Sequence, residues 1–154
     1  MSPRVDIVPA TSSLAERLAP KLRRADADEV CASHGWTPLQ ALLRSLELTP
    51  APKCLLFDGE PVAMWGVEPV NEAAGMGVAW LLGSDDLTRW PLTFWRVCKD
   101  ELAALRVEWP VLVNWIDARY EASLRWARHL GFKVDPPKPF GPAGALFCCA
   151  ALVR

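Results

Sequence analysis

Two polar residues near position 115 have the type and place to contact a ligand. Asn114 lies inside the apolar run 111–116, and Asp117 follows that run directly. Ligands of open α/β sheets collect at the C-terminal edge of a central strand, where Asp117 would lie. An aspartate there equally suits a helix N-cap or a turn. Burying the Asn114 amide unpaired would cost roughly 1–3 kcal/mol, so we expect a partner, either a ligand or a backbone carbonyl.

The cysteines and histidines do not form a pattern that predicts a metal site or a thiol nucleophile. The five cysteines follow no framework spacing, and no Cys-x-x-Cys or His-x-x-x-His motif occurs. Cys148 and Cys149 are neighbours whose side chains would point to opposite faces of a strand, which disfavours a bond between them. We therefore expect no metal and predict buried thiols in a reducing compartment.

Length and composition predict one domain over residues 1–154, with the capacity to bury a substantial core. The net charge is −1 and no basic tract occurs, which argues against nucleic acid as a partner. Neither a signal segment nor 18 consecutive apolar residues occur, so we expect a soluble protein without membrane contact. The eight tryptophans against one tyrosine favour a Trp-rich core; Trp36, Trp90 or Trp109 on a docking surface is the alternative.

Apolar periodicity and turn residues predict a mixed α/β fold in the order β-α-α-β-β-β-α-β-α-β-β. The acidic segment 25–32 is also expected to be helical, and the proline-rich segment 136–144 is expected to be a loop. The strands are expected at residues 4–9, 54–57, 62–67, 78–82, 111–116 and 146–153, with another from Phe132. The main helices are expected from the cap at 11–13 through Leu14, Leu18 and Leu22, from Pro38 to before Pro50, and over residues 91–105 and 121–130.

The C-terminal half resembles the N-acetyltransferase (GNAT) fold, in which a buried strand leads through a short turn into a helix that ends at glycine. The resemblance is carried by Asn114-Trp115-Ile116-Asp117-Ala118-Arg119-Tyr120-Glu121-Ala122-Ser123 and by Leu130-Gly131-Phe132. It implies acetyl-CoA as a possible cofactor, bound between the fourth and fifth strands.

The chain also resembles a family of short-tailed-phage proteins, described as internal virion or acetyltransferase-like proteins. This resemblance is carried by Trp80-Leu81-Leu82-Gly83-Ser84-Asp85-Asp86-Leu87 with Asp117-Ala118-Arg119, by Ser123-Leu124-Arg125-Trp126, and by Asp58-Gly59-Glu60-Pro61 and Pro139-Phe140-Gly141. It implies a virion protein made in a bacterial cytoplasm. Its partners would be portal, tail or internal core proteins, with oligomers formed through assembly.

The GNAT resemblance places the cofactor pyrophosphate on backbone N–H groups between the fourth strand and the next helix. The matching residues Leu82, Gly83 and Ser84 would bind the cofactor, with Arg89 offsetting nearby negative charge. Asp85 and Asp86 place two carboxylates there, and Pro91 lacks an amide donor. These carboxylates also favour simple stabilisation of a helix N-terminus.

The resemblance also bears on proton transfer. Ala127 stands where these enzymes commonly have a tyrosine acid, and Tyr120 stands where they have an asparagine that bonds the pantetheine arm. Asn114, Tyr120 and Ser123 are further candidate cofactor-binding residues. The fourth strand carries no carboxylate, which leaves Asp117 and Glu68 as candidate bases for an active enzyme.

Two functions follow from these residues. The first is a virion-associated protein on a GNAT scaffold with a degenerate acetyl-CoA site. The alternative is an active acyl-CoA-dependent N-acetyltransferase that acts on a small amine or a host protein.

Overall fold

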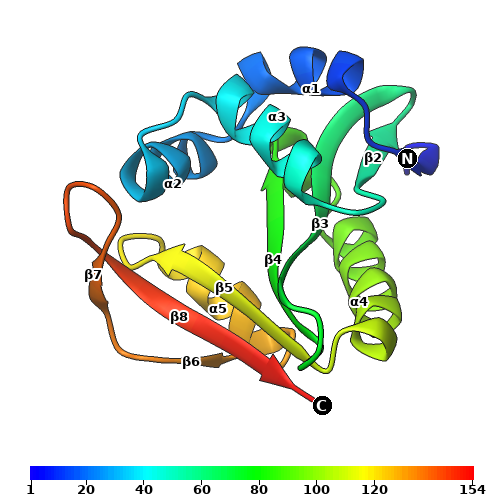
Figure 1. Cartoon of the computed structure of the whole chain (residues 1–154). Helices are drawn as coiled ribbons and strands as arrows, with labels where there is room; N and C mark the ends of the chain where they lie inside the picture. The colour runs from blue at the N-terminus through cyan, green and yellow to red at the C-terminus, as the bar shows by residue number, and fades with distance from the viewer.

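Eight strands form one mixed sheet in the order β1-β2-β3-β4-β5-β8-β6, with β7 also paired to β8, in this computed structural model of residues 1–154 (Figure 1). Every pair is antiparallel except β4 with β5, which is parallel. The strands are β1 (Val5–Pro9), β2 (Lys53–Phe57), β3 (Glu60–Asn71), β4 (Met76–Gly83), β5 (Val111–Asp117), β6 (Lys133–Val134), β7 (Lys138–Phe140) and β8 (Ala145–Val153). The predicted fold class is confirmed.

Helices cover both faces of the sheet. They are α1 (Ser12–Leu18), α2 (Arg24–His34), α3 (Pro38–Leu48), α4 (Pro91–Glu108) and α5 (Glu121–His129), with 3-10 turns η1 (Ala19–Lys21) and η2 (Asp85–Arg89). Trp80 and Leu82 of β4 pack with α1–α3, whereas Leu81 packs with α4 and α5. Successive strand residues point to opposite faces, so α1–α3 lie on one face and α4 and α5 on the other. No helix is long and apolar enough to cross a membrane.

Three local predictions are corrected by the structure. The helix expected to include Leu22 ends at Leu18, because Pro20 in the following 3-10 turn has no N–H for helical bonding. The acidic segment forms helix α2 as expected, so the predicted element order is corrected to three helices before β2 rather than two. Strand β7 lies inside the expected loop; Pro139 fits there because β7 pairs only with β8.

The pairing between β4 and β5 is short and leaves a gap in the middle of the sheet. The parallel ladder joins Met76, Gly77 and Val78 to residues 111–113, and no further pairs follow. Figure 1 shows β4 and β5 pointing in different directions beyond this ladder. Residues 78–81 and 113–115 are therefore only half-buried, although both strands are central. The divergence exposes backbone edges and side chains that a closed sheet would cover.

The turn between β7 and β8 packs against the C-terminal half of α2. A Cβ atom added at Gly141 would lie 2.5 Å from the Ala32 carbonyl oxygen and 2.8 Å from that of Ser33. Gly141 also has a φ of +80°. This contact and the stacking of Phe140 on Trp115, with ring centroids 4.6 Å apart, fix the end of α2 over β5.

We predict that Gly141→Ala destabilises the protein more than Gly144→Ala does. Both residues have positive φ, which costs an alanine about 1–2 kcal/mol, but Gly144 has no heavy atom near its added Cβ. The backbone clash at Gly141 should add roughly 1–3 kcal/mol. Urea denaturation of both variants measures the difference, and equal losses of unfolding free energy would contradict the close contact.

Candidate functional site

A cavity of about 380 Å³ lies at the divergence of β4 and β5 and is lined by residues from both faces of the sheet. Asp26 and Glu29 of α2 and Arg23, the residue directly before this helix, line it on one face. The other wall is mainly apolar and is formed by residues of α4, α5 and the strands below them, among them Phe94, Cys98, Leu102, Trp126 and Phe132. A volume of this size suits a small organic ligand.

Helix α2 is fixed to the end of β4 through Asp26. The Gly83 backbone N–H donates to Asp26 Oδ2 at 2.9 Å, and Arg23 Nη2 donates to the same oxygen at 2.9 Å. The Arg23 backbone N–H donates to the Gly83 carbonyl at 2.8 Å. Asp26 is only 6% exposed, so its charge needs these partners.

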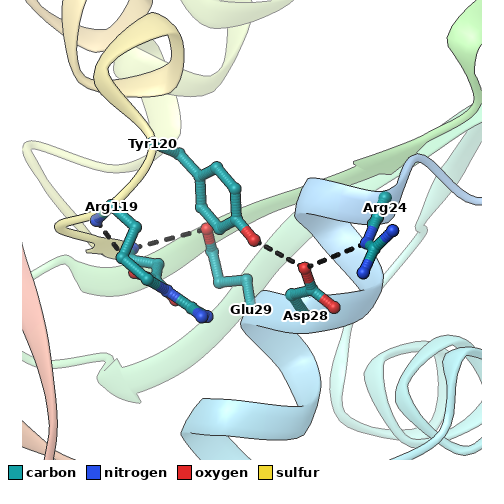
Figure 2. Close-up of polar contacts among 6 residues, drawn as sticks. Arg24, Asp28, Glu29, Arg119 and Tyr120 are labelled. Carbon is teal, nitrogen blue, oxygen red and sulfur yellow. Dashed lines mark hydrogen bonds and ion pairs between the residues drawn. The ribbon is translucent and has the colours of Figure 1, made fainter.

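The same helix contacts the end of β5 through two further carboxylates (Figure 2). The Asp117 backbone N–H donates to Glu29 Oε2 at 3.4 Å, and the Tyr120 hydroxyl donates to Asp28 Oδ2 at 2.7 Å. Arg24 also lies 3.9 Å from Asp28. Three carboxylates on α2 thus span the gap between the two diverging strands.

Asp117 forms a closed ion pair with Arg119 in the turn after β5. Arg119 Nη2 lies 2.7 Å from Asp117 Oδ2, and the Arg119 backbone N–H donates to Oδ1 at 3.0 Å. Burial acts to raise the Asp117 pKa, but the hydrogen bonds and charge of Arg119 outweigh it and lower that pKa. A carboxylate held in this way is a weak proton acceptor, and its geometry is that of a turn aspartate.

Glu29 has the opposite electrostatic environment. Burial raises its pKa to about 8, and the negative charges of Asp26 and Asp117 act in the same direction. The Asp117 N–H and the charge of Arg23 offset only part of this effect. Sequence reasoning missed Glu29. The acidic character of residues 25–32 was visible, but nothing in the sequence separates Glu29 from Asp26 or Asp28.

Asn114 and Ser123, two of the predicted cofactor-binding residues, line the cavity. Neither side chain has a hydrogen-bond partner within the protein. Both residues are half-buried, so their polar atoms remain accessible. Asn114 is only half-buried, so the expectation that its amide must have a partner is not met. These two side chains can offer hydrogen bonds to a ligand in an otherwise apolar wall.

The other predicted cofactor-binding residues do not line the cavity. The Leu82 side chain packs in the core with α1 and α3, and the Gly83 N–H is taken by Asp26. Ser84 Oγ accepts the Asp86 N–H at 3.3 Å, and Arg89 pairs with Asp86 at 3.4 Å in solvent. The Tyr120 hydroxyl is bound to Asp28.

Glu68, the second predicted base, lies on β3 outside the cavity wall. Glu68 instead acts on His34. Burial lowers the pKa of His34, and the negative charge of Glu68 offsets part of this decrease. The structure therefore does not bring Glu68 together with Asp117 or with the cavity.

The segment expected to bind pyrophosphate is not shaped as a phosphate loop. Residues 85–89 form the 3-10 turn η2, which carries Asp85 and Asp86, and Pro91 occupies the first turn of α4. Of the residues that the resemblance assigns to acyl-CoA, only Asn114 and Ser123 line the apolar cavity. The η2 carboxylates do not favour the phosphates of this cofactor.

The cavity contains neither an activated cysteine thiol nor a cluster of metal-ligating side chains. Cys98 lines the wall, but burial raises its pKa to about 12 and keeps the thiol neutral. No group of three or more His, Cys, Asp or Glu side chains is arranged to hold a metal ion. Transfer through a cysteine intermediate is therefore disfavoured.

The chain has the fold of GNAT acetyltransferases. Its structure is similar to that of Ard1 from Thermoplasma volcanium, with a TM-score of 0.74, 10% identity and 97% of both chains covered. The ribosomal-protein-alanine N-acetyltransferase from Brucella melitensis gives a TM-score of 0.70 at 18% identity, covering 97% of this chain and 99% of that protein. The ribosomal-protein-S18-alanine N-acetyltransferase from Escherichia coli gives 0.67 at 16% identity, covering 97% and 94%.

At these identities the comparisons establish the fold alone. No family model and no curated protein matches the chain. The expected resemblance to phage virion proteins has no support in these comparisons, whose matched structures are mostly N-acetyltransferases.

We predict that Glu29 makes the protein less stable as the pH rises from about 5 to about 8. The folded-state pKa of Glu29 is about 8, against an ordinary value of 4.5, so the native state keeps a proton that the unfolded chain releases in this range. Because the native state binds more protons, the free energy of unfolding falls with pH, on the order of 3 kcal/mol in total. Glu29→Gln should remove most of this fall.

Urea denaturation across that pH range measures the effect. Glu16→Gln, an exposed change on α1, is the matched control and should keep the wild-type pH dependence. Parallel curves for the wild type and Glu29→Gln would show that Glu29 titrates normally.

Proposed function

We propose that this protein is an acyl-CoA-dependent N-acyltransferase, with acetyl-CoA as the donor to test first and an amine as the acceptor. The observation that carries the proposal is the cavity at the β4–β5 divergence, lined on one face by α2 and on the other by α4 and α5. Donor and acceptor can approach such an opening from opposite faces of the sheet. The GNAT fold supports this assignment, although a fold alone does not establish an activity.

The donor side is the apolar wall formed by α4 and α5. Asn114 and Ser123 provide two free polar side chains for the amide groups of a pantetheine arm. The β4 edge beyond Val78 has no partner strand, so its backbone groups are also open to hydrogen bonding. Apolar side chains around these groups exclude water and strengthen polar contacts.

The acceptor side is the α2 face, where Glu29 is the acidic side chain of the cavity wall without a cationic partner. A bound acyl-CoA would supply an acyl carbon activated as a thioester. Because Cys98 is neutral, direct attack by the amine on that carbon is favoured over a covalent enzyme intermediate. Ala127 cannot donate a proton to the leaving thiolate, so solvent must do so.

Titration with acetyl-CoA by calorimetry at moderate salt is the direct test of this proposal. Measurable binding, followed by release of free thiol with a panel of peptide N-termini and small amines, is the expected result. If neither the wild type nor a variant lacking the η2 carboxylates binds acetyl-CoA, the proposal fails. That outcome would favour the scaffold role, and virion proteins would be the partners to seek by pull-down.

We predict that Asn114→Ala weakens acetyl-CoA binding roughly 2–10-fold, the value of one hydrogen bond. Calorimetry measures the change in Kd. Asn71→Ala is the matched control, because Asn71 is the last residue of β3, where its side chain accepts the Ala74 N–H. Equal affinities for the wild type and Asn114→Ala would remove Asn114 from the donor site.

We predict that replacing both Asp85 and Asp86 by asparagine tightens acetyl-CoA binding. The change removes two negative charges from η2, where the donor phosphates would lie, and keeps side-chain size. The gain should shrink at high salt, because exposed charges are screened. Unchanged affinity at low salt would mean that the phosphates do not approach η2.

A further inference from the structure

Three carboxylates line the cavity, and two of them are neutralised by cations. Asp26 is paired with Arg23 at 2.9 Å, and Glu101 is paired with Lys53 at 2.8 Å. Glu29 has no cationic partner within hydrogen-bonding distance, and its only hydrogen bond is the one at 3.4 Å from the Asp117 N–H to Oε2. Oε1 of Glu29 is therefore free to accept a proton from a ligand in the cavity.

The other acidic groups near α2 are engaged elsewhere. Asp28 accepts the Tyr120 hydroxyl, and Asp117 is paired with Arg119. Glu68 does not line the cavity. Among the carboxylates of the cavity wall, only Glu29 combines a free oxygen with the absence of a paired cation.

We propose that Glu29 is the general base that deprotonates the acceptor amine, and that Asp26, three residues before it on α2, is a positioning residue that tunes it. The inference rests on the proposed acyl transfer and adds the residue that takes the proton. It departs from the expectation that Asp117 or Glu68 does so. The base would come from a helix that crosses the gap rather than from the strands that form it.

The charged groups around Glu29 agree with this role. Asp26 and Arg23 face it from α2, and Asp117, paired with Arg119, faces it from β5. Both oxygens of Asp26 accept hydrogen bonds from Arg23, which offset part of the rise that burial causes in the Asp26 pKa. A base is most effective when its pKa is near the working pH, and the pKa of Glu29 is about 8.

Proton transfer to Glu29 and protonation by solvent account for every bond that changes in the acyl transfer. The acceptor arrives as an ammonium ion, and Glu29 takes one proton from its nitrogen. The nitrogen then forms a C–N bond with the acyl carbon, the C–S bond breaks, and the sulfur leaves as a thiolate that solvent protonates. The second nitrogen proton and the proton on Glu29 pass to solvent, which restores the carboxylate.

We predict that Glu29→Gln lowers kcat/KM for acyl transfer by roughly 10²–10⁴-fold. The acetyl-CoA Kd measured by calorimetry should not change, because the donor binds on the opposite face. Asp28→Asn is the matched control, since it makes the same change on the same helix outside the cavity wall, and it should retain most of the activity.

The role of Asp26 is tested by the pH profile of kcat/KM with one acceptor throughout. Asp26→Asn removes a negative charge beside Glu29 and frees Arg23, so the acid limb of the profile should move to lower pH. Asp26→Glu keeps the charge and should leave the limb at the wild-type pH, which also controls for loss of the Gly83 contact. A purely structural role would lower the rate in Asp26→Asn without moving the limb.

The outcomes separate this inference from the proposed function. If the wild type transfers an acyl group and Glu29→Gln keeps its rate and pH profile, the base assignment is wrong while the acyltransferase proposal stands. If the wild type binds acetyl-CoA but transfers to no amine, both are overturned. An unmoved acid limb in Asp26→Asn would overturn the tuning role alone.

Discussion

Backbone pairing between β4 and β5 stops after Val78, and the candidate site depends on this interruption. A central strand that loses its neighbour leaves amide and carbonyl groups that need other partners. Helix α2 supplies two of them, since Asp26 accepts the Gly83 N–H and Glu29 accepts the Asp117 N–H. The opening is thus a stabilised part of the fold, and the side chains that stabilise it also face the cavity.

The two Asp-Arg pairs differ from Glu29 in what surrounds them. Asp26 and Asp117 each have an arginine two or three residues away in the sequence, so local spacing provides their counter-charge. Glu29 has none, and its burial therefore favours the protonated form. Of these three acidic groups, Glu29 is the one without an arginine partner, and its pKa is raised to about 8.

The sequence predicted the strands other than β7, the main helices and the position of Asp117 at a strand end, because these depend on local periodicity. It could not predict the role of Glu29, which arises from a contact between residues 88 positions apart. Asn114 and Ser123 were predicted as ligand contacts through the GNAT resemblance, and both line the cavity. Gly83 was predicted as a free donor, but its amide is taken by Asp26, 57 positions earlier in the chain.

The short ladder between β4 and β5 also divides the sheet mechanically. On one side β1 to β4 form a continuous antiparallel panel, and on the other β5 pairs with β8, which carries β6 and β7 (Figure 1). Only the pairs at Met76, Gly77 and Val78 and the side chains of α2 join the strand edges of the two panels across the gap. The width of the opening is therefore held by few backbone hydrogen bonds and mainly by side-chain packing, such as Phe94 of α4 stacked on Trp126 of α5. A ligand bound between the panels would replace the missing β4–β5 hydrogen bonds and fix the width of the opening.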